Sequence, residues 1–277
     1  MMILKKKIQS AIHSAKTTLI AGIDPDYEKI PQSLKSRFSN KTECVEAFCK
    51  AIIEKLSPVV CGFKFNLAFF EVLGPNAFDV LKNVLDAVPD NKLIIADAKR
   101  GDIGNTAKKY AEAFFDRLHC DFITVNPLMG FETIEPFLGD ARKGVFCLTL
   151  TSNPGADDFL LKSTQNGETL AVSIAAGLNK MQRKTDTVIG MVTGATKTER
   201  LHPVLAAYPE APLLIPGLGA QGGDISKLIK ALEFHKGVAF PVISRAIIYA
   251  SDGEDWQQKA NEKAIAFKNE LSPLYKA

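Results

Sequence analysis

The chain has 277 residues, of which 46% are hydrophobic, and this length and composition are typical of a globular protein with a sizeable core. Its 34 basic and 31 acidic side chains leave a net charge of +3, and no basic run is interleaved with aromatic residues. We therefore expect neither a nucleic-acid nor a membrane partner, while a small anionic ligand is compatible with the charge.

The cysteines and the N-terminus bear on where the protein resides. The five cysteines are odd in number and show no C-x-x-C spacing, which is typical of reduced, buried thiols in a cytoplasmic protein. The N-terminus runs from a basic to an apolar stretch, as signal peptides do, but the apolar part is short and ends in Asp-Pro-Asp. We expect instead an N-terminal helix that precedes the first strand, and no membrane-spanning segment.

Apolar runs rich in β-branched residues recur along the whole chain and predict strands. Segments with helical periodicity, such as TECVEAFCKAIIEKL and NTAKKYAEAFFDRL, lie between them. Strand followed by helix, repeated along the chain, predicts a (β/α)8 TIM barrel, and near-continuous apolar strands suit a parallel sheet covered on both faces. The eight predicted strands span residues 17–24, 59–66, 92–99, 121–127, 144–153, 187–196, 211–219 and 237–248.

The domain organisation follows from the absence of linkers. No stretch rich in Pro, Gly or Ser divides the sequence, so we expect a single barrel domain over residues 1–277. A Rossmann-type protein of two domains is the alternative architecture. The irregular stretch at residues 153–171 is long for a plain connection and indicates a loop over a functional site.

Polar residues stand where the predicted strands end. In a parallel barrel these ends meet at one face, which is where the active sites of this fold lie. The residues concerned are Asp24, Lys64, Asn66, Asp97, Lys99, Asn126, Ser152, Asn153, Thr193, Thr196, Ser244 and Arg245.

The stretch IIADAKRGDIGNT contains charges that a buried strand does not ordinarily hold. Asp97 and Lys99 are two residues apart, so both side chains point to the same face, into the barrel mouth. Asp102 follows three residues later and can return toward Lys99, while Lys64 adds a second cation. The alternative interpretation is a solvated cluster of mutually neutralised charges.

The turn PGLGAQGGD after the seventh predicted strand satisfies G-x-G-x-x-G through Gly217, Gly219 and Gly222. This pattern alone is weak support for a dinucleotide site, although Arg245 could meet the 2′-phosphate of NADP. Exposed backbone N–H groups together with Gln221 and Arg245 would form a simpler phosphate site at the ends of strands seven and eight. Glycines that serve only a tight turn are the third interpretation.

Two other kinds of site are not predicted. The histidines fit no paired metal-ligand spacing, and no G-x-S-x-G nucleophile elbow is present, so we expect neither a metal site nor a hydrolase. The four histidines are His13, His119, His202 and His235.

Seven motifs in a fixed order resemble the orotidine 5′-phosphate decarboxylase family, particularly its longer bacterial subgroup, called type 2. They are GIDPD, KFNLAFFE, DAKRGD, TSNPG, VTGAT, PGLGAQGGD and SRAI, and the resemblance covers residues 17–250. It implies an enzyme that converts orotidine 5′-phosphate to uridine 5′-monophosphate and carbon dioxide, the last step of de novo pyrimidine biosynthesis. Such an enzyme uses no cofactor and no metal.

The resemblance also implies roles for individual residues. Lys99 would protonate the C6 carbanion, within a catalytic charge network of Lys64, Asp97, Lys99 and Asp102. The substrate-binding residues would be Asp24 and Lys64 for the ribose hydroxyls, Ser152 for the pyrimidine edge, Pro216 beside the base, and Gln221 and Arg245 for the phosphate.

Asp102 and Thr106 match family residues that reach the site of a neighbouring subunit, which implies a homodimer with shared active sites. The sequence departs from the shorter members of the family at Ser244, where those members often have Gly before the phosphate arginine. The backbone contact of this residue to the phosphate is therefore not implied.

Two other functions stay open. One is a related magnesium-dependent enzyme that acts on a sugar phosphate, but such enzymes carry an acidic metal ligand where this chain has Lys64. The other is a non-catalytic nucleotide-binding barrel, for which a buried charge network would be an unnecessary cost.

Overall fold

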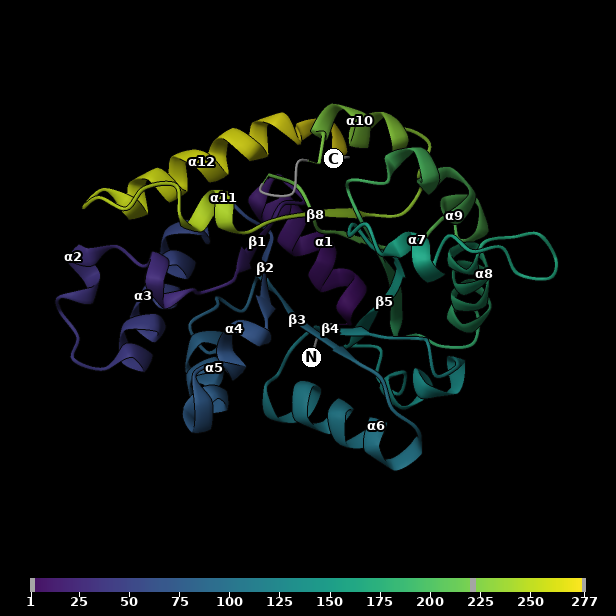
Figure 1. Cartoon of the computed structure of the whole chain (residues 1–277), viewed down its shortest axis with the longest axis horizontal. Helices are drawn as coiled ribbons and strands as arrows, with labels where there is room; N and C mark the ends of the chain where they lie inside the picture. Colours follow the sequence, from purple (N-terminus) through teal and green to yellow (C-terminus); the bar gives the residue numbers. More distant parts are fainter. Residues whose placement is uncertain (1–2, 220–222, 276–277) are drawn as a thin grey trace. The chain divides into compact units, whose positions relative to one another are not determined.

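The computed structural model describes residues 3–219 and 223–275. Eight parallel strands are hydrogen-bonded to one another in chain order and close into a barrel, which confirms the predicted (β/α)8 fold. The strands, labelled in part in Figure 1, are β1 (Ile20–Ile23), β2 (Gly62–Asn66), β3 (Leu93–Arg100), β4 (Phe122–Val125), β5 (Gly144–Leu150), β6 (Val188–Thr193), β7 (Leu213–Ile215) and β8 (Ala239–Ile243).

Helices precede the first strand and follow the others, as the periodicity of the sequence predicts. The helix α6 continues as a π-helix at Glu112–Arg117. The α-helices are α1 (Leu4–Ala15), α2 (Gln32–Lys35), α3 (Lys41–Leu56), α4 (Ala68–Glu71), α5 (Ala77–Leu85), α6 (Gly104–Ala111), α7 (Ala156–Phe159), α8 (Leu170–Gln182), α9 (Leu201–Ala207), α10 (Ile225–Ala231), α11 (Arg245–Ile248) and α12 (Trp256–Glu270).

Two segments differ from the prediction. The apolar run 237–248 is not one strand, because Ser244 has a ψ of −95° that turns the chain out of the extended conformation, and Arg245 begins a helical turn. The long stretch after β5 is not wholly irregular either, since α7 lies within it. In both places a short helical turn lies among residues that show no helical period.

The chain packs into two compact units. One holds residues 3–6, 99–219 and 223–241, and the other holds residues 7–98 and 242–275. The chain passes from one unit to the other within α1, β3 and β8, so neither unit is a continuous stretch of sequence. This differs from the two consecutive domains of the Rossmann alternative, while the single barrel domain stays a prediction.

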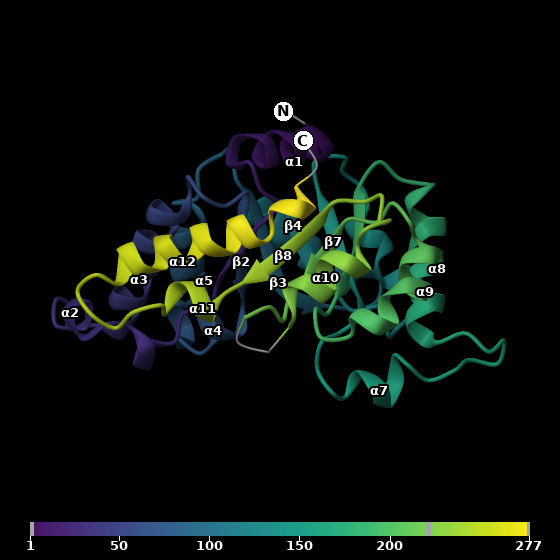
Figure 2. The ribbon, with the colours of Figure 1, turned by 90° about the horizontal axis from the view of Figure 1, so that it is seen from above.

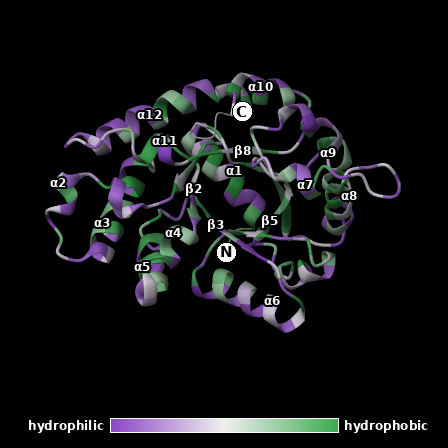
Figure 3. Cartoon of the chain, in the orientation of Figure 1, coloured by the Kyte–Doolittle hydropathy of each residue, from purple (hydrophilic) through white to green (hydrophobic). Residues whose placement is uncertain are grey.

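The unit that contains β1 and β2 has an aromatic stack between its helices. Phe48 of α3 is 1% exposed, and its ring stacks on Tyr249 at 5.6 Å and on Trp256 at 5.1 Å between centroids. Helix α12 packs against α3 and α11, as Figures 1 and 2 show. Hydrophobic and hydrophilic residues alternate along α3 and α12 in Figure 3, so each helix has an apolar side to bury.

The unit that contains β4 to β7 is built on stacked phenylalanines. Phe122 and Phe146 lie with their ring centroids 4.5 Å apart, and Phe240 meets Phe146 edge-on at 6.2 Å. Helices α8 and α9 lie side by side and α8 covers β5 and β6. Rigid, fully buried strands of this kind hold the loops that follow them in fixed positions.

None of the helices in the described part of the chain has the length and apolarity needed to span a membrane.

Candidate active site

Lys64 lies between two carboxylates at the ends of β1, β2 and β3. Its Nζ donates a hydrogen bond of 3.0 Å to Oδ2 of Asp97 and lies 3.7 Å from Oδ1 of Asp24. The three side chains are between 5% and 13% exposed. The parallel register places Lys64 beside Gly22 and Ile95, so the strands themselves bring the three charges together.

The pKa of Lys64 reports the balance of forces in this cluster. Burial alone would lower the pKa of the ammonium, but the charges of Asp97 and Asp24 and the hydrogen bond to Asp97 outweigh it and raise the pKa above its ordinary value. Lys64 is therefore a fixed positive charge at neutral pH. Because it is only 4% exposed, this charge acts in a medium that screens it far less than water does.

Asp24 is held incompletely by the protein. Its Oδ1 is buried and accepts no hydrogen bond from the described residues, although the Lys64 ammonium lies nearby. A buried carboxylate oxygen without a donor is costly and uncommon in a folded protein. The atom is thus suited to accept a hydrogen bond from a ligand hydroxyl.

Arg245 begins α11 directly after β8 and is exposed. The preceding Ser244 turns its side chain onto β1, because a Cβ at Gly22 would lie 1.7 Å from the Ser244 hydroxyl oxygen. Only glycine fits at position 22 beside this serine. Ser244 also accepts hydrogen bonds at its carbonyl from Ile247 and Ile248, which starts the helical turn.

Lys99 has an unusual backbone in the other unit. Its φ is +48°, in the left-handed region that costs a residue with a side chain roughly 1–2 kcal/mol. The Lys99 N–H donates a hydrogen bond of 2.8 Å to the hydroxyl of Thr124 on β4, which holds this conformation in place. Backbone strain maintained by specific contacts is common at functional sites.

Asp102 and Thr106 lie on the segment that follows. Oδ1 of Asp102 accepts a hydrogen bond of 2.8 Å from the N–H of Ile103, the next residue along the chain. The expected return of Asp102 toward Lys99 stays a prediction. Thr106 lies exposed in the first turn of α6.

The loops after β5, β6 and β7 are joined through the segment Gly194–Thr196. The hydroxyl of Thr196 donates a 2.6 Å hydrogen bond to the carbonyl of Ser152, and the N–H of Ala195 donates to the carbonyl of Pro216 at 3.0 Å. A Cβ at Gly194 would lie 2.4 Å from Cα of Ser152, so the close approach requires glycine. Two predicted substrate-binding residues are thus held by one segment.

One predicted site residue cannot be placed. Gln221, and with it Gly222 of the glycine-rich turn, lies outside the described residues. The turn on either side of them is described: Gly217 and Gly219 have φ of +101° and +74°, and the N–H of Gly223 donates to the carbonyl of Gly217. Asp224 then caps α10 by accepting from the N–H of Lys227.

The sequence of this chain matches the model of the "Orotidine 5'-phosphate decarboxylase / HUMPS family" over residues 17–259. The match covers every strand from β1 to β8. The chain belongs to this family.

Curated relatives of the family match nearly the full chain. The orotidine 5′-phosphate decarboxylase of Dehalococcoides mccartyi strain CBDB1 is 38% identical over 270 residues, 96% of each chain. That of Herpetosiphon aurantiacus is 39% identical over 262 residues, 95% of each chain. Among solved structures, the OMP decarboxylase of Leishmania donovani is similar with a TM-score of 0.81, at 26% identity and with both chains fully covered.

Two residues with contacts at this family site, Thr124 and Tyr249, were not singled out by the sequence, and Thr196 was named only as a polar residue at a strand end. Thr124 and Thr196 bind backbone atoms of Lys99 and Ser152, and Tyr249 binds the carbonyl of Asp24. The sequence offered two signals for these residues. Thr124 lies in an apolar strand, and Tyr249 follows the predicted phosphate-binding Arg245 by four residues. Neither signal distinguishes such a role from ordinary core packing.

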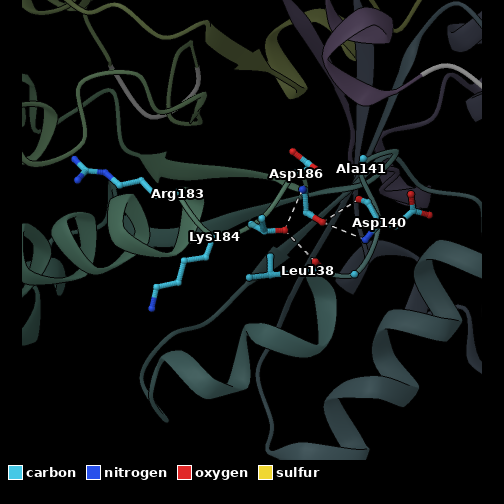
Figure 4. A pocket seen from close by; sticks show the side chains of 9 residues that line it. Leu138, Asp140, Ala141, Arg183, Lys184 and Asp186 are labelled. Atoms are coloured by element: carbon cyan, nitrogen blue, oxygen red, sulfur yellow. Dashed lines mark hydrogen bonds between the residues drawn. The ribbon is translucent and has the colours of Figure 1, made fainter.

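A hollow of about 560 Å³ lies elsewhere, before the first residues of β5 and β6. Its wall is closed by hydrogen bonds between the two loops: the Thr187 hydroxyl donates to the carbonyl of Asp140, and the Thr185 hydroxyl donates to that of Leu138 (Figure 4). Arg183 and Lys184 extend away from this junction in the same view. The hollow contains no predicted site residue.

Within residues 3–219 and 223–275, no three His, Cys, Asp or Glu side chains are grouped so that they could bind a metal ion.

Replacing Lys64 by Met tests the charge cluster as a stabilising element. Asp24 and Asp97 would stay buried without a cation, so we expect the free energy of unfolding at pH 7 to fall by about 3 kcal/mol. Because the folded pKa of Lys64 is raised above 10.5, its stabilisation is present below that pH and is lost as the pH rises through the folded value. The difference in the free energy of unfolding between parent and variant should therefore stay constant from pH 7 to 9.5 and decrease above pH 10.5.

The matched control is Lys82→Met, which removes an exposed ion pair to Asp86 of 2.6 Å. This change should cost less than about 0.5 kcal/mol at every pH. Urea unfolding followed by circular dichroism measures both variants. Equal losses for the two lysines would show that the Lys64 cluster contributes no more than a surface pair.

Proposed function

We propose that this chain decarboxylates orotidine 5′-phosphate to uridine 5′-monophosphate and carbon dioxide, the last step of de novo pyrimidine biosynthesis, without metal or cofactor. The observation that carries the proposal is the buried Lys64 ammonium between Asp24 and Asp97 in a chain of this family. The relatives named as orotidine 5′-phosphate decarboxylases match it over nearly their whole length.

The reaction requires that negative charge be stabilised at one carbon. The bond between C6 and the carboxylate carbon breaks, carbon dioxide leaves, and the electron pair stays on C6, where the ring delocalises it poorly. A preorganised cation is the most effective way to stabilise such a charge. Lys99 supplies that cation and then donates a proton from Nζ to C6, which completes the product.

The acidic residues set the electrostatics around this lysine. Asp97 lies beside the departing carboxylate and disfavours the bound ground state, and the hydrogen bond from Lys64 orients the Asp97 carboxylate. Asp102 completes the network. The strained φ of Lys99 supports its role, because a backbone held out of its preferred region fixes the direction of the side chain.

The remaining residues bind the parts of the substrate that do not react. Asp24 accepts from the ribose hydroxyls with its unsatisfied Oδ1, and Lys64 contacts the same sugar. Ser152 contacts the pyrimidine edge and Pro216 packs beside the base. Gln221 and Arg245 bind the phosphate, whose binding energy orients the ring.

A homodimer with shared active sites is part of the proposal, with Asp102 and Thr106 directed at the second subunit. Four exposed apolar side chains, at the start of α6 and in the segment after β4, support it, because large apolar side chains are preferentially buried. Helix α6 packs against the turn that begins at Phe131. The apolar side chains are Ile103, Leu128, Met129 and Phe131, which are 57%, 75%, 54% and 38% exposed. A monomer in sedimentation equilibrium at micromolar concentration would contradict this assembly.

The candidate to separate is the related magnesium-dependent sugar-phosphate enzyme that the sequence left open. Lys64 argues against it, because an ammonium stands where such an enzyme would present an acidic metal ligand. A cytoplasmic location, with a small-molecule substrate and neither nucleic acid nor membrane as partner, completes the proposal.

Mixing the protein with orotidine 5′-phosphate in the presence of a chelator tests the function. We expect the pyrimidine absorbance to change at an undiminished rate as uridine 5′-monophosphate forms, because no step uses a metal. Turnover that requires magnesium would favour the sugar-phosphate class. Tight binding without turnover would favour a non-catalytic nucleotide-binding barrel.

Replacing Arg245 by Ala tests the phosphate site. We expect a loss on the order of 3–5 kcal/mol of transition-state stabilisation, measured as kcat/KM for the full nucleotide, because the remote phosphate contributes binding energy to the reaction. Orotidine without phosphate should be a poor substrate of the parent and should be insensitive to the change.

The control for this experiment is Arg183→Ala, at the end of α8, which should leave kcat/KM unchanged for both substrates. If Arg245→Ala slowed orotidine as severely as its phosphate ester, Arg245 would act on the base or on the fold, and the phosphate role would be wrong.

A further inference from the structure

Tyr249 joins two segments that carry separate substrate-binding residues of the proposed site. Its hydroxyl accepts a hydrogen bond of 2.6 Å from the N–H of Asp26 and donates toward the carbonyl of Asp24 at 3.1 Å. The turn Asp24-Pro25-Asp26 is therefore held from both sides by one phenol. The carbonyl of Asp24 belongs to the same residue whose carboxylate faces Lys64.

The tyrosine also belongs to the segment of Arg245. It follows α11 directly, and its N–H donates to the carbonyl of Arg245 at 3.1 Å. The ring cannot move freely, because it stacks on Phe48 with an angle of 7° between the planes. A rigid ring thus connects the helical turn that begins with Arg245 to the turn that begins with Asp24.

The protonation state of the phenol suits this contact. Burial raises the pKa of Tyr249 above its ordinary value, so the hydroxyl keeps its proton at neutral pH and can donate and accept at once. Oδ1 of Asp24 is held by the Lys64 ammonium as an ion pair at 3.7 Å, and it accepts no hydrogen bond within the described chain. The position of this carboxylate thus also depends on the backbone of Asp24.

We propose that Tyr249 is a positioning residue for the ribose. It fixes the position of the Asp24 carboxylate through the backbone of the turn, and it keeps the position of this carboxylate constant relative to Arg245. This inference rests on the proposed function. It predicts that the Tyr249 hydroxyl affects ligand affinity only through the ribose hydroxyls, although the phenol itself touches no ligand.

The test compares two nucleotides in binding titrations with the parent and with Tyr249→Phe, which keeps the stacked ring. The ligands are uridine 5′-monophosphate and its 2′,3′-dideoxy analogue, which lacks the hydroxyls that Asp24 would accept from. We expect the variant to bind uridine 5′-monophosphate about tenfold more weakly, as the loss of one oriented hydrogen bond predicts, and the analogue within twofold of the parent. In kinetics, KM should rise more than kcat falls.

Tyr208→Phe is the matched control. Tyr208 is also buried, and its hydroxyl donates to the carbonyl of Ile189, a residue of β6 with no proposed ligand role. Both variants should lower the melting temperature, but only Tyr249→Phe should reduce the discrimination between the two nucleotides. In an Asp24→Ala background, Tyr249→Phe should change the affinity for uridine 5′-monophosphate by less than twofold, since the contact it positions is already absent.

Equal weakening of both nucleotides by Tyr249→Phe, or additive effects of the two substitutions, would overturn the inference and leave Tyr249 as a packing residue. The inference would also be overturned if the parent binds uridine 5′-monophosphate tightly and turns over its substrate, and Tyr249→Phe has the same affinity and turnover. A parent that binds neither nucleotide would instead contradict the proposed function, on which the inference depends.

Discussion

The buried ion pairs of Lys64 are the interaction on which the rest of the site depends. An ammonium that is 4% exposed is stable only because Asp97 and Asp24 compensate for the water that it has lost. The Lys64 ammonium donates a hydrogen bond to Asp97, and one buried oxygen of Asp24 has no hydrogen-bond donor among the described residues. In the proposed function, this cluster, which is costly for the fold, binds a ligand that brings hydroxyl groups and a departing carboxylate.

The fold supplies this arrangement through its strand ends and the contacts between its loops. In a parallel barrel each strand places one or two side chains at the same face. The backbone of the loop that follows each strand then has to be fixed in position. Thr196 and Gly194 do this for Ser152, Thr124 for Lys99, and Tyr249 for Asp24. These contacts use the backbone atoms of Ser152, Lys99 and Asp24 rather than their side chains.

The sequence predicted the barrel and the family because strand periodicity and the ordered motifs are local properties of the chain. The clustering of Lys64 with Asp97 followed from their places at the ends of neighbouring predicted strands and from the family motifs. The hydrogen bond of Asp102 to Ile103 and the helical turn at Arg245 did not, since each depends on backbone angles that neighbouring residues impose. The contact between Tyr249 and Asp26 could not be predicted either, because 223 residues separate the two and no short sequence pattern encodes such a contact.

The most direct test of the account is the turnover of orotidine 5′-phosphate by a Lys99→Ala variant, with a chelator present. In the proposed mechanism Lys99 supplies both the charge that stabilises C6 and the proton that C6 receives. Its removal should therefore abolish measurable decarboxylation, while circular dichroism and the melting temperature show an intact fold. Turnover within tenfold of the parent enzyme would contradict the central role of this lysine and, with it, the proposed mechanism.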